Sequence, residues 1–172
     1  MHHILTGAPG AGKTIILRGL EHAGVAVVEE AATDLIAWRR AQGVSEPWTD
    51  PTFTNDIVAL QLVRRARAGQ ETTVFDRSPV CTLALARFLG HDPSPALITA
   101  AAAARDAYAR EVFFVESLDF IVNTEARRID LDAARRFGDV HREVYADLGF
   151  TLIPVAPAAV EARVAAVLAH LG

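Results

Sequence analysis

The sequence predicts an α/β protein in which a five-stranded parallel sheet is covered by helices on both faces. Short apolar runs alternate with longer stretches of helical apolar spacing, the pattern of chains built from βαβ units. Hydrophobic residues make up 51% of the chain and charged residues 22%, which is typical of a globular protein. A chain of 172 residues fits one compact domain with one core. We therefore expect residues 1–172 to form a single domain.

The five strands are expected in the short apolar runs, which favour extended structure. In chain order these runs are HHILT at 2–6, VAVVE at 25–29, TTVF at 72–75, EVFFVE at 111–116 and FTLIPV at 150–155. Seven helices are expected where apolar residues recur three and four positions apart. These stretches are 13–22, 31–41, 55–68, 80–89, 95–108, 130–148 and 158–171.

Four residues mark expected helix ends. Gly24 and Gly149 follow helical stretches, at the position where a positive φ ends a helix and glycine adopts it most easily. Asn55 and Asp130 open helical stretches, where their side chains can accept hydrogen bonds from free backbone N–H groups. These signals set the expected boundaries of the helices.

The first long loop, at 43–54, clusters Gly, Pro, Asp and Thr with two aromatic residues. Loops of this length are often functional. Trp48 and Phe53 either stack on a flat substrate or cover the core, and the sequence favours neither alternative.

The residues after the first expected strand match the phosphate-binding pattern G-x-x-x-x-G-K-[ST] in full. They are Gly7, Ala8, Pro9, Gly10, Ala11, Gly12, Lys13 and Thr14, between an apolar strand and an amphipathic helix. Glycines allow a tight turn that aims backbone N–H groups at phosphate oxygens, and the helix N-terminus adds positive charge. Lys13 supplies a point charge, and the Thr14 hydroxyl is expected to bind Mg²⁺. No guanine-selecting N-K-x-D stretch is present, which favours ATP over GTP.

Polar side chains follow the second and third expected strands, at the edge where parallel sheets bind ligands. Asp76 comes directly after TTVF and is our first candidate for the base or for the ligand of a magnesium-bound water. Arg77 can hold a phosphate or pair with a carboxylate, although Asp76 and Arg77 could also form an ion pair that only fixes the loop. Strand alternation sends Glu29 and Glu30 to opposite sides, and Glu30 is the better candidate to face a substrate.

Four arginines follow the fourth expected strand in a chain that is acidic overall. Arg127 and Arg128 precede the next helix, so they are expected to form a lid that stabilises the transferred phosphoryl group, with surface charge as the alternative. Arg135 and Arg136 lie inside that helix near two aspartates, which favours a solvated face.

Charge and composition exclude several classes. The net charge of −4 and a pI near 5.8 predict no nucleic-acid partner, because such proteins usually carry a basic face. No apolar run reaches the roughly 18 residues that span a bilayer, and no secretory signal is recognised, so we expect a soluble, cytoplasmic protein with no membrane partner. The single cysteine, Cys81, is expected to be a buried apolar side chain, and His141 to be structural or solvated. The alanine-rich helix at 96–108 either packs against a second copy or covers the sheet, which leaves an oligomer open.

Four segments together resemble a known family. They are ILTGAPGAGKT, VVEEAATDLI, VFDRSP and EARRIDLDAARRFGDVHREVYADLGFTLIPVAPAAVEARV. Over nearly its whole length the chain resembles AAA-domain-type ATPases related to nicotinamide riboside kinase, a branch of the P-loop kinases. The resemblance implies a kinase-like P-loop NTPase domain with strand order 2-3-1-4-5 and an arginine-bearing lid, which is short here.

The resemblance also implies roles for individual residues. Lys13 and Thr14 take the nucleotide and magnesium roles. Asp76 and Arg77 become the pair at the end of the third strand. Arg127 or Arg128 takes the lid role.

The expected function is that of an ATP- and Mg²⁺-dependent phosphotransferase acting on a small hydroxyl-bearing metabolite, nucleoside-like or a natural product. The strand-end carboxylates and the arginine-rich segment support it. The alternative is a nucleotide-binding regulatory NTPase, in which occupancy or hydrolysis switches a partner surface and no acceptor is phosphorylated. An inactive structural subunit is a third interpretation, which the intact Lys13, Thr14 and Asp76 disfavour.

The two main alternatives differ in the space beyond the terminal phosphate. A kinase needs a closed acceptor cavity, for which the sequence offers Trp48, Phe53 and Glu30. A switch needs mobile segments that contact both the nucleotide and a partner.

Overall fold

The computed structural model describes residues 1–116 and 131–171. Within them five parallel strands form one sheet in the order β2-β3-β1-β4-β5, which confirms the α/β class and the implied strand order. The strands are β1 (His2–Gly7), β2 (Ala26–Val28), β3 (Thr73–Asp76), β4 (Glu111–Val115) and β5 (Thr151–Val155). The helices are α1 (Lys13–His22), α2 (Ala31–Ala41), α3 (Phe53–Arg67), α4 (Pro79–Leu89), α5 (Pro95–Ala107), α6 (Leu131–Asp147) and α7 (Val160–Leu171), with a 3₁₀ turn at Pro47–Thr49. None of the helices in the described ranges is both long and apolar enough to cross a membrane.

The central strand β1 pairs with β3 on one side and with β4 on the other. Leu5 of β1 pairs with Asp76 of β3 and with Phe113 of β4. Because all the strands run in the same direction, their carboxyl ends lie at one edge of the sheet. This edge brings the phosphate-binding pattern, Asp76 and the residues after β2 together.

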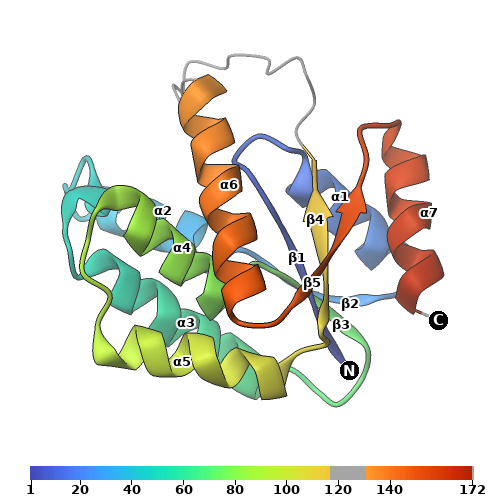
Figure 1. Ribbon diagram of the computed structural model, residues 1–172, viewed down its shortest axis with the longest axis horizontal. Coiled ribbons are helices and arrows are strands. Elements are labelled where there is room, and N and C mark those ends of the chain that lie inside the picture. Colours follow the sequence, from blue (N-terminus) through green and yellow to red (C-terminus); the bar gives the residue numbers. More distant parts are fainter. Residues whose placement is uncertain (117–130, 172) are drawn as a thin grey trace.

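Helices cover both faces of the sheet, as the sequence predicts (Figure 1). α1 and α7 pack on one face, where Leu5 and Val74 are buried. α4, α5 and α6 lie on the other face, over Ile4 and Phe75. Neighbouring strand residues contribute to opposite cores because side chains along a strand alternate in direction.

A smaller apolar cluster joins α2 to α3. Its buried members are Ala31, Leu35, Phe53 and Ile57, and Trp48 packs against them. Both aromatic residues of the first long loop therefore cover this cluster, which answers the question that the sequence left open.

Two of the four expected helix-end signals are confirmed and one is wrong. Gly24 and Gly149 have φ angles of 87° and 73°. Asn55 does not cap a helix, because α3 already begins at Phe53, and its side-chain oxygen accepts a hydrogen bond from the Ser94 hydroxyl at 2.5 Å instead. Asp130 lies outside the described residues.

Candidate active site

The phosphate loop connects β1 to α1 at the carboxyl edge of the sheet. β1 ends at Gly7 and α1 begins at Lys13. Gly12, directly before the helix, has a φ of 88°, which glycine adopts without strain. Gly7 lies against β4, and a Cβ atom there would be 2.3 Å from the carbonyl oxygen of Val115. The loop therefore requires glycine for its turn at one end and for a close backbone approach at the other.

Gly7→Ala is expected to destabilise the fold far more than Gly24→Ala. Both glycines have positive φ, but nothing lies within 4 Å of a Cβ built at Gly24, so that substitution costs only the backbone strain, about 1–2 kcal/mol. At Gly7 the new Cβ also collides with the Val115 backbone, and we expect an additional loss of roughly 2–3 kcal/mol. Urea denaturation measures both unfolding free energies. Equal losses would show that β4 moves aside without cost.

A cavity of about 470 Å³ opens over the loop. Its wall consists of Pro9, Gly10, Gly12, Lys13, Thr14 and Ile15 from the loop and α1, with Glu30, Thr33 and Arg77 completing it. Backbone N–H groups at the start of α1 carry partial positive charge and have no intrahelical acceptor. The cavity can therefore accept the phosphates of a nucleotide.

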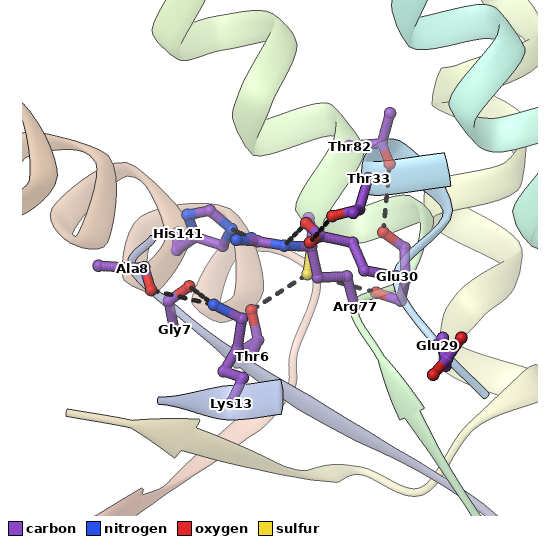
Figure 2. A network of polar contacts seen from close by, with 12 residues as sticks. Thr6, Gly7, Ala8, Lys13, Glu29, Glu30, Thr33, Arg77, Thr82 and His141 are labelled. Atoms are coloured by element: carbon purple, nitrogen blue, oxygen red, sulfur yellow. Dashed lines mark hydrogen bonds and ion pairs between the residues drawn. The ribbon is translucent and has the colours of Figure 1, made fainter. Parts of the chain in front are cut away.

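The Lys13 side chain folds back over the loop (Figure 2). Its Nζ donates hydrogen bonds to the carbonyl oxygens of Gly7 at 3.1 Å and Ala8 at 3.0 Å. Burial lowers the pKa of Lys13 to about 8, the positive charge of Arg77 acts in the same direction, and nearby carboxylates partly oppose both effects. The side chain thus holds a positive charge at the cavity wall, where a phosphate oxygen can reach it.

Lys13 is the only lysine of the chain, so selective ¹³C labelling of lysine gives a single side-chain signal. We expect this signal to titrate near pH 8 in the free protein. Binding of ATP should raise the pKa, because the negative charge of the phosphates stabilises the ammonium form. Adenosine, which has no phosphate, is the control and should leave the titration unchanged. An identical titration with and without saturating ATP would contradict phosphate binding at Lys13.

Arg77 is held in a fixed orientation beside Glu30. It is the one non-glycine residue with positive φ (72°) in the described part of the chain, and its backbone N–H donates to the carbonyl oxygen of Leu5 at 3.0 Å. Its Nε donates to Glu30 Oε1 at 2.5 Å, and the Thr33 hydroxyl donates to Glu30 Oε2 at 2.7 Å. Burial favours a raised pKa for Glu30, but the positive charges of Arg77 and Lys13 and these hydrogen bonds lower it to about 2. The Arg77–Glu30 pair is therefore ionised near neutral pH.

The side chains of Glu29 and Glu30 lie in different surroundings. Glu29 is exposed and forms an ion pair with Arg18 on α1. Glu30 lines the phosphate cavity. This divergence agrees with the expected alternation and brings Glu30, not Glu29, to the site.

Asp76 is buried at the end of β3, with 5% of its surface exposed. Its Oδ1 is buried and has no hydrogen-bond partner within residues 1–116 and 131–171. Burial raises the pKa of Asp76, and the positive charges of Lys13 and Arg77 partly oppose this effect. A buried carboxylate oxygen without a protein partner fits a water or a metal ligand. The Thr14 side chain is exposed in the cavity wall, and a hydroxyl and a carboxylate are oxygen ligands of the kind that suit Mg²⁺, which keeps several of its own waters.

A second, smaller pocket of about 130 Å³ adjoins the phosphate cavity. Pro9, Glu30 and Arg77 line both spaces, so the two meet at the Arg77–Glu30 pair. The rest of the smaller pocket is lined by Ala32, Ile57, Gln61, Cys81, Thr82, Leu85 and Phe137. Neither Trp48 nor Phe53 belongs to this wall, because both are engaged in the cluster between α2 and α3.

Gln61 and Thr82 form the polar end of this second pocket, and sequence reasoning missed both. The Thr82 hydroxyl donates to Gln61 Oε1 at 2.9 Å. Gln61 is buried on the same face of α3 as Ile57 and Val58. A polar residue at helical spacing from apolar core positions was the available signal, since burying an amide is costly unless it has partners.

A buried group of hydroxyls and the single thiol lies behind the second pocket. The phenol oxygen of Tyr145 is 2.9 Å from both Ser78 Oγ and Cys81 Sγ, and Thr6 Oγ1 is 3.1 Å from the same sulfur. Cys81 is 2% exposed, which confirms its expected burial. These contacts connect α6 to α4 and to β1.

Arg163 of α7 reaches the phosphate loop from the face of the sheet that α7 shares with α1. It is 2% exposed, and its Nη2 donates to the carbonyl oxygens of Ala11 at 3.0 Å and Glu116 at 3.1 Å. One arginine thus holds a carbonyl of the loop and a carbonyl after β4. Nothing in the local sequence distinguishes Arg163 from a surface arginine of a helix.

The arginines expected after the fourth strand are only partly described. Arg127 and Arg128 lie outside the described residues. Arg135 and Arg136 lie on α6, where both are exposed, in agreement with a solvated face.

Comparison with known proteins identifies the family to which the chain belongs. The sequence matches the AAA domain family over residues 2–163. No curated protein matches the chain. The fold is similar to that of deoxyadenosine kinase from M. mycoides with the products dCMP and a flexible dCDP bound, with a TM-score of 0.64, 14% identity, and 99% of this chain and 98% of that chain covered. The structure of deoxyadenosine kinase from M. mycoides with bound dATP gives a TM-score of 0.60 at the same identity and coverage.

At 14% identity these structures establish a shared nucleoside-kinase-like fold. The family match includes the phosphate loop, β3 and the first turn of α7, and it spans nearly the whole chain. The protein therefore belongs to the AAA domain family, a family of P-loop proteins.

Proposed function

We propose that the protein is an ATP- and Mg²⁺-dependent phosphotransferase that phosphorylates a hydroxyl group of a small, nucleoside-like or natural-product metabolite. The observation that carries this proposal is that the phosphate cavity and the second pocket share Glu30 and Arg77. A kinase must bring a phosphate donor and a hydroxyl acceptor together at one point. A regulatory NTPase needs only the first of the two spaces.

In this proposal the phosphate loop and Lys13 bind the phosphates of ATP. Thr14 would bind Mg²⁺ directly and Asp76 would hold one of its water ligands, which is supported by the buried Asp76 Oδ1 that has no hydrogen-bond partner among the described residues. When bound, Mg²⁺ neutralises negative charge on the phosphate oxygens. Asp76 and Thr14 thus serve the donor side of the reaction.

Glu30 and Arg77 lie at the boundary between the phosphate cavity, which would hold the donor, and the second pocket, which would hold the acceptor. Glu30 lines both spaces whereas Asp76 lines neither, which favours Glu30 as the group that accepts the hydroxyl proton or orients the hydroxyl. Arg77, fixed by Glu30, supplies positive charge to the transferred phosphoryl group. The lid role of Arg127 and Arg128 rests on the sequence and the resemblance alone.

The second pocket supports an acceptor with a flat apolar body and a polar edge. Its apolar wall includes Ile57, Leu85 and Phe137, and the amide of Gln61 with the Thr82 hydroxyl forms the polar end. Nucleosides have this character, and the structures of similar fold are described as deoxyadenosine kinase. Nucleosides are therefore the first acceptors to test.

The test is the release of ADP from ATP and Mg²⁺ by the purified protein, alone and with a panel of nucleosides, amino sugars and other hydroxylated metabolites. The Lys13→Ala variant provides the blank. Release that rises strongly with one acceptor, together with the phosphorylated acceptor detected by mass spectrometry, is the expected result. Slow release that no acceptor changes, but that Lys13→Ala abolishes, would instead support a regulatory NTPase.

A further inference from the structure

His141 of α6 is fully buried, and the proposed function assigns it no role. Its Nε2 lies 3.3 Å from Nη1 of Arg77, on the opposite side of that residue from Glu30 (Figure 2). Arg77 is thus contacted from two elements that are distant in sequence. The segment after β2 supplies Glu30, and α6 supplies His141.

The hydrogen bonds of His141 fix which ring nitrogen carries its proton. Nδ1 is 2.8 Å from the backbone carbonyl oxygen of Phe137, which can only accept, so Nδ1 is the donor. Burial lowers the pKa of His141 to about 3, and the positive charge of Arg77 acts in the same direction. The ring is therefore neutral, and the lone pair on Nε2 accepts from the Arg77 guanidinium.

Phe137, one turn earlier on α6, contributes a second contact. The Arg77 guanidinium lies 5.9 Å from the centre of the Phe137 ring, and that ring packs edge-on against His141 with centroids 4.3 Å apart. Phe137 is also part of the wall of the second pocket. The same turn of α6 therefore shapes the second pocket and contacts the arginine at its edge.

From these contacts we infer that His141 is a positioning residue for Arg77. Its neutral Nε2, together with the Phe137 ring, holds the guanidinium at the boundary between the phosphate cavity and the second pocket. The inference rests on the proposed function, in which Arg77 acts on the transferred phosphoryl group. A guanidinium that is already oriented before substrates bind needs little reorganisation during transfer.

The test compares two substitutions of similar size, His141→Leu and His141→Gln. Both remove the hydrogen bond to Phe137, but only glutamine carries an oxygen that reaches the position of Nε2. We expect His141→Leu to lower kcat by roughly 10- to 100-fold, the range that misplacement of a reacting group produces. The KM for ATP should change less than kcat, because Lys13 and the rest of the phosphate loop still line the cavity in the variant. His141→Gln should retain most of the activity.

NMR of the arginine side chains provides a readout that does not depend on turnover. The guanidinium signals of Arg77, identified by their absence in Arg77→Lys, should be ordered in the wild type and in His141→Gln and averaged by motion in His141→Leu. His170→Leu is the matched control, because His170 makes the same Nδ1 contact to a carbonyl four residues earlier, with Ala166 at 2.9 Å, on exposed α7 surface. This control should alter neither the Arg77 signals nor kcat.

The possible results separate the inference from the proposed function. Unchanged Arg77 signals in His141→Leu, or equal losses of kcat in the leucine and glutamine variants, would overturn the positioning role. If His141→Leu does not fold, His141→Asn replaces it, because the shorter asparagine oxygen does not reach Arg77. If the wild type phosphorylates no acceptor, the proposed function fails, and the NMR comparison still decides whether His141 orders Arg77.

Discussion

Lys13→Met should lower acceptor-dependent turnover by roughly 10²- to 10³-fold, the usual cost of removing one charged group that stabilises a transition state. Methionine keeps most of the side-chain stem and removes the ammonium that lies against the carbonyl oxygens of Gly7 and Ala8. Negative charge moves across the phosphate oxygens during transfer, so the loss should appear in kcat as well as in the KM for ATP. Steady-state kinetics with the best acceptor of the panel measures both constants.

Arg18→Met is the matched control for Lys13→Met. It removes one positive charge from the same helix, but Arg18 lies outside the cavity and pairs with Glu21 and Glu29. Its turnover should equal that of the wild type. A Lys13→Met variant that is folded and retains turnover within a few-fold of the Arg18→Met variant would remove Lys13 from the mechanism.

Glu30→Gln and Asp76→Asn should fail in different ways. Glu30 adjoins both the phosphate cavity and the second pocket, so Glu30→Gln should lower kcat roughly 10²- to 10⁴-fold at every Mg²⁺ concentration, the range for loss of a general base. Asp76→Asn should raise the Mg²⁺ concentration needed for half-maximal activity and should recover part of its activity when Mg²⁺ is abundant. Magnesium titrations of both variants measure this difference.

Glu29→Gln is the control for this pair, because Glu29 is exposed and pairs with Arg18 away from the site. It should have wild-type kinetics at all Mg²⁺ concentrations. The reverse pattern, with a Mg²⁺-independent loss of kcat in Asp76→Asn and a raised Mg²⁺ requirement in Glu30→Gln, would make Asp76 the base.

The features of the fold that were predicted correctly depend on short-range patterns. Short apolar runs between helical stretches predicted every strand of the described sheet. The glycines at 24 and 149 marked helix ends with positive φ. The start of α3 was missed because Thr52 and Asn55 are both plausible first residues of a helix. The contact between Asn55 and Ser94, 39 residues away, is not visible in either local segment.

The residues of the candidate site also differ in whether short-range patterns reveal them. The phosphate loop is one continuous segment, and Glu30, Asp76 and Arg77 follow strands whose carboxyl ends must share an edge, so all could be selected from the sequence. Gln61 and His141 enter the site because α3 and α6 pack beside α4. Which face of a helix meets which neighbour depends on packing between residues far apart in the chain, and a single sequence does not record it.

The hydrogen bonds of Arg163 have a consequence for the order of events during protein synthesis. The phosphate loop is translated early, but the carbonyl of Ala11 is held by the side chain of residue 163. In addition, the strand that leads into the loop lies between β3 and β4. A nascent chain that has not yet reached α7 contains the whole phosphate-binding pattern but lacks the contact that fixes its backbone. Under the proposed function, ATP is therefore expected to stabilise chains that have completed α7 more than their precursors, because a ligand stabilises only the state that binds it.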